Sequence, residues 1–318
     1  MGGAIAGVAC ALAVLACATG ASARDPTPPS PPAAPPVIAA PAPAEEPAVP
    51  EPLKLTQDLS QRLTLAVTVN GQGPYNFLVD TGSDRTVISR ELAASLALPP
   101  GARVRLRETV GADEVGTVVI DRLAIGNRVV RHIEAPALAA KDLGAAGMLG
   151  VDALRDLHVV MDFKAMQMSS SASRAEAADS RTIVVHGKSR FGQLILTHSK
   201  IHGVPIVVVV DSGAEVSVGN PALLRLLTQH TLSQNPPATT EIIGVTGRRL
   251  TLEQDRIAEA DVGGVVIRNM PLAFAALPIF DHLGLTDTPA LFLGMDVLSQ
   301  CERVSVDMRR REATFTLR

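Results

Sequence analysis

The stretch FLVDTGSDRTVIS, residues 77–89, decides the fold, and VVVVDSGAEVSVG, residues 207–219, repeats its pattern. In each stretch an apolar run ends in an Asp, a hydroxyl residue and a Gly. An Asp at the end of a buried strand, followed by a Gly that is free to turn tightly, presents its carboxylate at the rim of a core. The two carboxylates belong to Asp80 and Asp211, which lie 131 residues apart.

The segments around these two turns also recur in the same order. Residues 65–79 and 196–210 each read as a strand, a Gly-containing turn and a second strand. Downstream, residues 147–163 and 291–308 each hold an apolar pair, a Gly, a short helical turn and a final strand. The sequence therefore predicts two copies of one unit of roughly 110 to 135 residues.

Composition favours a globular β protein and excludes several classes of partner. The 318 residues are 47% hydrophobic and 19% charged, enough for about two domains, and short runs of Val, Ile, Leu and Thr punctuated by Gly favour strands. A net charge of −3 gives no electrostatic basis for binding nucleic acid or an anionic membrane surface. With no Trp and one Tyr, the sequence has few side chains on which bases could stack, so we predict no nucleic-acid partner.

Two such carboxylates could perform acid–base chemistry together. If Asp80 and Asp211 meet across a pseudo-twofold axis, they cannot both ionise easily, so they share a proton. One carboxylate can then deprotonate a water while the other protonates or hydrogen-bonds the carbonyl oxygen of a peptide bond. Because this hydrolysis uses neither a metal ion nor a cofactor, we predict none.

The motifs resemble those of the aspartic peptidases. VDTGS and VDSGA are each followed by an apolar-apolar-Gly element, MLG at 148–150 and FLG at 292–294. A chance D-[TS]-G is expected about 0.1 times in a chain of this length, so two complete copies are not explained by chance. The resemblance covers residues 60–318, is greatest for the retropepsin-like branch, and implies an all-β fold of two acid-protease-like β-barrel lobes, related by a pseudo-twofold axis, with the active cleft between them.

The resemblance implies a role for each residue of the two Asp turns. Asp80 and Asp211 would form the catalytic dyad, and Thr81 and Ser212 would hydrogen-bond across the lobe interface below it. The alternative for the dyad is a relic that binds peptides without cutting them.

Four glycines would support these turns. By the same resemblance, Gly82 and Gly213 would offer their backbone N–H groups to the carboxylates. Gly150 and Gly294 would let the following strand pass close behind each active loop.

The residue after the Gly differs between the two turns. A hydroxyl at Ser83 would donate to the Asp and lower its pKa, whereas Ala214 supplies no such bond. We therefore expect an asymmetric dyad in which Asp80 is the more readily ionised member.

Residues 107–120 and 242–253 lie where the family has flap hairpins, although ordinary hairpins are the alternative interpretation. Arg248 and Arg249 in the second segment could select acidic substrate residues or could simply be solvated charges. Asp152 and Asp296, which follow the two apolar-apolar-Gly elements, are expected to cap helices.

The N-terminal residues predict export. Residues 1–23 form an uncharged apolar segment, and three alternatives stay open: cleavage after Ala23, lipidation at Cys17, or an uncleaved anchor. Residues 24–52 hold 12 of the 23 prolines and predict an extended tether. We expect a periplasmic or membrane-anchored protein that meets the membrane only through its signal segment or lipid.

The remaining boundaries follow from the repeat. We predict an N-terminal lobe at 53–164, a Ser/Ala-rich linker at 165–181 and a C-terminal lobe at 182–318. The expected protein is a monomer with an internal pseudo-dimer, an endopeptidase whose partner is a polypeptide in extended conformation. The alternative is a non-catalytic peptide-binding module of the envelope.

Overall fold

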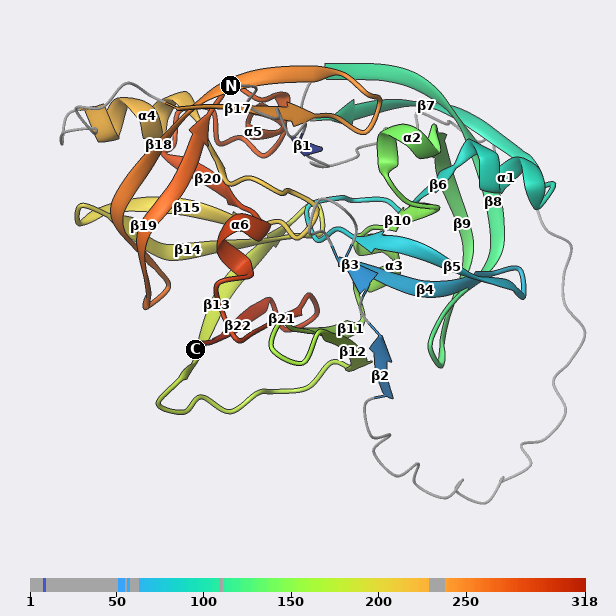
Figure 1. Cartoon of the computed structure of the whole chain (residues 1–318), viewed down its shortest axis with the longest axis horizontal. Coiled ribbons are helices and arrows are strands. Elements are labelled where there is room, and N and C mark those ends of the chain that lie inside the picture. Colours follow the sequence, from blue (N-terminus) through green and yellow to red (C-terminus); the bar gives the residue numbers. More distant parts are fainter. Residues whose placement is uncertain (1–7, 10–50, 55, 58–62, 109–110, 229–237) are drawn as a thin grey trace, which may run out of the picture.

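The computed structural model describes residues 8–9, 51–54, 56–57, 63–108, 111–228 and 238–318, which form a mostly β protein of two lobes (Figure 1). The predicted all-β, two-lobed fold is thereby confirmed. The predicted signal segment, apart from β1 (Val8–Ala9), lies outside the described residues, as does the predicted tether before Glu51. Within the described part of the chain, no helix has the length and apolar character needed to span a membrane.

The N-terminal lobe is built on a closed barrel. Its sheet runs in the order β3-β4-β5-β10-β6-β9-β8-β7, and a further pairing of β4 with β8 closes six of these strands into a ring. The strands are β3 (Thr56–Gln57), β4 (Leu63–Val69), β5 (Gln72–Val79), β6 (Val87–Ser89), β7 (Pro100–Glu108), β8 (Gly111–Ile125), β9 (Arg128–Leu138) and β10 (Gly147–Leu149). The helices are α1 (Arg90–Ser95), α2 (Ala140–Leu143) and α3 (Val151–Leu154).

The C-terminal lobe has the same order of elements. Here the ring is β14-β15-β20-β16-β19-β18, closed by pairing of β18 with β14, and β1 adds to β17 in parallel. The strands are β14 (Gln193–Ile201), β15 (Val204–Val210), β16 (Val218–Gly219), β17 (Ala238–Ile243), β18 (Arg249–Val262), β19 (Val265–Phe274) and β20 (Ala290–Leu293). The helices are α4 (Pro221–Thr228), α5 (Pro278–His282) and α6 (Met295–Leu298).

A sheet shared by both lobes runs beneath the barrels. It has the order β13-β22-β21-β11-β12-β2. At its centre β11 pairs with β21 in antiparallel register, and Val160 lies opposite Ser305, its counterpart in the other lobe. The pseudo-twofold axis therefore passes between these two strands. The sheet consists of β2 (Glu51–Lys54), β11 (Leu157–Asp162), β12 (Gln167–Ala172), β13 (Thr182–Arg190), β21 (Arg303–Asp307) and β22 (Glu312–Thr316).

The shared sheet includes part of the predicted linker. Residues 167–172 form β12, which pairs with β11 and β2, and β2 in turn starts inside the predicted tether. The Ser-rich composition of 167–172 led to the prediction of a linker. A ladder of backbone hydrogen bonds needs no apolar side chains, so this segment can pair as a strand.

The strand that leads into Asp80 is buried on both faces. Phe77 and Val79 pack into one hydrophobic cluster, and Leu78, which points the other way, packs into a second. This explains why the sequence shows a continuous apolar run here rather than the alternation of a half-buried strand.

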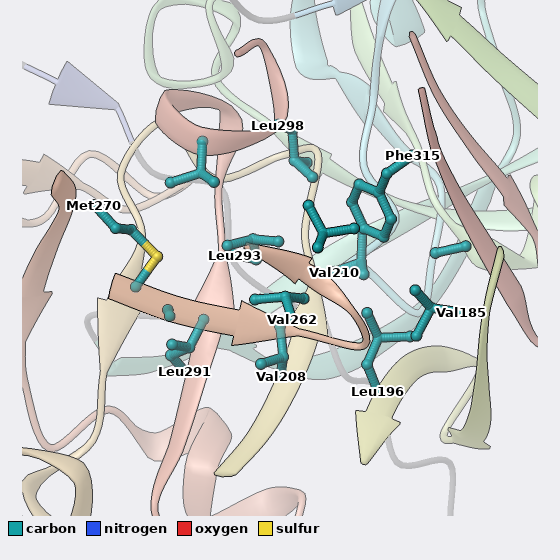
Figure 2. Packing of buried hydrophobic residues seen from close by; sticks show 14 of the residues in the cluster. Val185, Leu196, Val208, Val210, Val262, Met270, Leu291, Leu293, Leu298 and Phe315 are labelled. Atoms are coloured by element: carbon teal, nitrogen blue, oxygen red, sulfur yellow. The ribbon is translucent and has the colours of Figure 1, made fainter. Parts of the chain in front are cut away.

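The strand that leads into Asp211 is also buried on both faces. Figure 2 shows Val208 and Val210 of β15 pointing into the main core of the C-terminal lobe, beside Leu291 and Leu293 of β20. Val209 faces a separate cluster. Because β15 and β20 pair in parallel, they carry the two halves of the motif side by side.

Candidate active site

The two Asp residues are held at equivalent places by equivalent strands. The N–H of Asp80 donates to the carbonyl of Leu149 at 3.0 Å, and the N–H of Asp211 donates to that of Leu293 at 3.0 Å. Each Asp thus continues the parallel pairing of β5 with β10 or of β15 with β20. Both Asp side chains are fully buried.

The structure brings the two Asp residues together across the lobe interface. A β-carbon built on Gly82 would lie 2.5 Å from Cγ of Asp211, and one built on Gly213 would collide with the carboxyl group of Asp80. The two carboxyl groups are therefore near enough for Asp80 to affect the pKa of Asp211 directly. The absence of a side chain at each Gly therefore leaves space for the Asp carboxyl group of the other lobe. Because each lobe makes this space for the other, both lobes need the D-[TS]-G pattern.

Thr81 and Ser212 exchange hydrogen bonds across the same interface. The N–H of Thr81 donates to Oγ of Ser212, and the N–H of Ser212 donates to Oγ1 of Thr81, both at 3.1 Å. Each hydroxyl then donates to a carbonyl of the opposite lobe, that of Val210 or Val79, at 3.0 Å. These four bonds fix the two active loops relative to each other.

Replacing Thr81 by Val should destabilise this junction. Valine keeps the shape of threonine but leaves a buried N–H and a buried carbonyl without their partner, at a cost of about 2–4 kcal/mol in the free energy of unfolding. Urea denaturation measures this loss. Thr239→Val, at an exposed position of β17, is the matched control and should change stability little. Equal stabilities for the two variants would contradict the role assigned to Thr81.

Backbone donors also converge on the carboxylates. Gly82 donates to Oδ1 of Asp80 at 2.8 Å, and Gly213 donates to Oδ1 of Asp211 at 2.9 Å. Ala214 adds a third donor at 3.2 Å. These bonds stabilise ionised carboxylates, whereas burial opposes ionisation.

Burial has the larger effect at the dyad. It raises the pKa of Asp211 from 3.8 to about 7, against the opposing hydrogen bonds from Asp80, Gly213 and Ala214. Because the two carboxyls interact so closely, the raised pKa belongs to the pair. The pair can hold one proton in the acid to neutral range, which acid–base catalysis requires.

Ser83 does not contact the carboxylate as expected. Its hydroxyl donates to the carbonyl of Arg85 at 2.9 Å, and that single donor is then used. The predicted asymmetry of the dyad therefore loses its proposed cause.

Gly150 and Gly294 let the chain pass close to the two active loops, as expected, but the segment that passes there is not a strand. A β-carbon at Gly150 would collide with the backbone of Arg85, and one at Gly294 would lie 2.8 Å from the carbonyl oxygen of Ala214. Each Gly is followed by a short helix, α3 or α6, rather than by a strand. The chain that passes behind each active loop is thus the start of a helix.

Asp152 and Asp296 do not cap those helices as expected, because Gly150 and Gly294 occupy the cap positions. Asp152 instead accepts from the N–H and hydroxyl of Thr86, at 2.8 and 2.7 Å. Asp296 binds the equivalent Ser217 in the same way. Both Asp residues therefore anchor the segment that follows each active loop.

The sequence reasoning missed a third carboxyl beside the dyad. Asp84 follows Ser83, and burial, together with the negative charge of Asp80, raises its pKa from 3.8 to about 7 despite the nearby Arg85. Gln193 reaches across from the other lobe and donates from Nε2 to the carbonyl of Gly82 at 2.6 Å, and its amide also lowers the pKa of Asp84 in part. Asp84 could have been found from the sequence, because it is an acidic residue directly after the DTGS motif. Nothing in the sequence pointed to Gln193.

Asp84 should make the fold less stable as pH rises. Because its pKa is higher in the folded than in the unfolded chain, the protonated form stabilises the fold, and this contribution is lost between pH 3.8 and about 7. Asp84→Asn should flatten part of the fall in unfolding free energy between pH 4 and pH 7, as measured with urea. The exposed Asp287→Asn is the control, and parallel pH dependences for parent and Asp84→Asn would contradict the expectation.

Hairpins from the two lobes meet above the dyad-bearing loops. The hairpins β7–β8 and β17–β18 run along the upper edge of Figure 1. Thr246, in the turn before β18, donates from its N–H to Glu108 of β7 at 3.0 Å and also from its hydroxyl. Arg248 pairs with Asp113 of β8 at 2.7 Å, so polar contacts connect the two hairpins.

Within the described residues, no group of three or more His, Cys, Asp or Glu side chains is arranged to hold a metal ion.

Family models match both halves of this site. Residues 65–156 match the family described as "gag-polyprotein putative aspartyl protease", and residues 197–297 match the family described as "Aspartyl protease". The first match contains Asp80 and the second contains Asp211. A search among curated proteins finds no match.

Proposed function

The chain belongs to the aspartyl proteases, with two such domains in tandem, and we propose that it is an aspartic endopeptidase whose catalytic dyad is Asp80 and Asp211. The observation that carries the proposal is the reciprocal approach of each turn's Gly to the other lobe's Asp.

The geometry supports a mechanism that uses one shared proton. A water between the carboxyls is deprotonated by the ionised member as it attacks the peptide carbonyl carbon. The protonated member donates its proton to the carbonyl oxygen, which gives a neutral tetrahedral intermediate. The carboxyl that took the proton from water then donates a proton to the leaving nitrogen, while the other carboxylate takes a proton from a hydroxyl group of the intermediate. The C–N bond breaks, the C=O bond of the new carboxylic acid forms, and the pair again holds one proton.

The proposed substrate is a polypeptide in extended conformation. The hairpins β7–β8 and β17–β18 carry backbone groups above the dyad, and a strand-like peptide could pair with such groups. Glu108 and Thr246 join the two hairpins, so these backbone groups are held together on one side of the dyad-bearing loops.

Cleavage of an unfolded protein tests the proposal. The full chain is incubated between pH 3 and pH 8 with a reduced, alkylated protein, and the products are mapped by mass spectrometry. We expect internal cuts in the unfolded protein and resistance of the same protein in its folded form. Binding of the unfolded protein without cuts at any pH would instead favour a non-catalytic binding module.

We further propose export to the periplasm or to the membrane surface that faces it, on the basis of residues 1–23. Mass spectrometry of the N-terminus of the protein purified from cells should find either Arg24 or a lipid-modified Cys17 as the first residue, or else the uncleaved chain in the membrane fraction. An intact N-terminus in a soluble cytoplasmic fraction would contradict the proposal.

A further inference from the structure

The two arginines that the sequence suggested for binding acidic substrates are already paired. Arg248 binds Asp113, and Arg249 binds Glu241 at 2.6 Å. Both ion pairs lie within or between the hairpins. A different group of basic residues is better placed to meet a substrate.

This group, which we call the basic cluster, consists of Arg107, Arg190 and His282. Arg107 comes from β7 of the N-terminal lobe, whereas Arg190 ends β13 and His282 ends α5 of the C-terminal lobe. Burial lowers the pKa of His282, and the positive charges of Arg107 and Arg190 lower it further, against the charge of Asp281. Two cationic arginines and a histidine that favours its neutral form therefore lie close together. A β-carbon on Gly284, two residues after His282, would lie only 3.0 Å from the guanidinium group of Arg190.

An aromatic side chain borders the basic cluster. The ring of Phe191 lies against that of His282, with centroids 4.1 Å apart and planes tilted by 36°. Phe191 is 51% exposed, although it is a large hydrophobic residue. The stack holds His282 in place and leaves an apolar surface beside the cations.

The two arginines of the cluster have unused hydrogen-bonding capacity. Neither Arg107 nor Arg190 forms a side-chain hydrogen bond or an ion pair with another residue of the described part of the chain. Both side chains are exposed. Guanidinium groups that converge without carboxylate partners favour binding of an anion.

Short stretches of chain connect the cluster to the hairpins and to the dyad-bearing loop. Arg107 directly precedes Glu108, which contacts the opposite hairpin. Arg190 begins the turn that leads to Gln193, whose amide holds the carbonyl of Gly82 in the active loop. A β-carbon on Gly192 in that turn would lie 2.9 Å from Val151 of the N-terminal lobe, so the turn bridges both lobes.

We propose that Arg107, Arg190 and His282 form a subsite that binds an acidic side chain of the substrate a few residues from the scissile bond. This inference rests on the proposed peptidase function and names its substrate class. An extended peptide advances about 3.3 Å per residue, so a peptide held at the dyad passes from the active loop toward the cluster within a few residues. There the guanidinium groups bind the Glu or Asp carboxylate, and Phe191 packs against its methylene groups.

The test measures binding separately from cleavage. A series of fluorescent peptides carries a reduced, uncleavable bond in place of the scissile amide, with Glu or Gln at each position in turn. Binding to the full chain is followed by fluorescence anisotropy at low and high salt. The variant is Arg107→Gln/Arg190→Gln, and the control is Arg105→Gln/Lys188→Gln, which removes two exposed positive charges from the same two strands.

At one peptide position we expect Glu to bind about five- to tenfold more tightly than Gln, the effect of one or two exposed ion pairs. The preference should weaken at high salt, disappear in Arg107→Gln/Arg190→Gln and persist in the control. No preference for Glu at any position, or the same preference in both double variants, would overturn the proposal. Cleavage of the matching amide peptides reports on the peptidase function independently, so either claim can fail alone.

Discussion

Replacing Asp211 by Asn should lower kcat about 10⁴-fold, because the dyad supplies both the general acid and the general base of the proposed reaction. The amide cannot take the proton that the pair now shares. The same loss is expected for Asp80→Asn. Hydrolysis of a peptide identified from the cuts in an unfolded protein, measured at the optimum pH of the parent, gives the two values of kcat.

The stability of Asp211→Asn separates a loss of chemistry from a loss of structure. Burial raises the pKa of Asp211, so ionisation of this group costs stability as pH rises through about 7. A neutral Asn avoids that cost, so the variant should be at least as stable as the parent at pH 8. If the variant is inactive and also unfolded, misfolding explains the loss of activity. A folded variant with the kcat of the parent would show that Asp211 is not part of a catalytic dyad.

Replacing Gly213 by Ala should lower kcat about 100-fold or more, since misplacing a catalytic group by about 1 Å costs that much. The added methyl group would occupy the space of the Asp80 carboxyl group, which must then move away from Asp211. Gly82→Ala should act in the same way on Asp211. Neither substitution removes a functional group, so an activity loss reports on geometry alone.

Gly116→Ala is the matched control for both glycine variants. No atom lies within 4 Å of the place its methyl group would take. Its kcat and unfolding free energy should stay close to those of the parent. Parental activity in Gly213→Ala would show that the two lobes do not approach as closely as the structure indicates.

The fold could be predicted because its two sequence signals, an apolar run before each Asp and a Gly after it, are local and occur once in each lobe. The apolar runs before Asp80 and Asp211 reflect strands that are buried on both faces, and the glycines after them reflect space needed by the opposite carboxyl group. Each signal is readable within a few residues. Its second occurrence fixes the symmetry of the lobes.

The contacts that the sequence did not predict depend on the folded backbone. The sequence allows the Ser83 hydroxyl to donate either to Asp80 or to a nearby carbonyl, and in the folded chain it donates to the carbonyl of Arg85. Gln193 comes from the other lobe, 111 residues after Gly82, with no motif around it. The strand at 167–172 has a composition typical of a linker, and its place is set by the neighbouring strands.

The most direct test of the shared dyad compares kcat for Asp80→Asn, Asp211→Asn and the double variant with the parent. Two carboxyls that act as one unit lose their function when either is removed, so all three variants should have the same residual kcat within a few fold. If the double variant instead falls by the product of the two single effects, or if either single variant retains parental kcat, Asp80 and Asp211 do not act together.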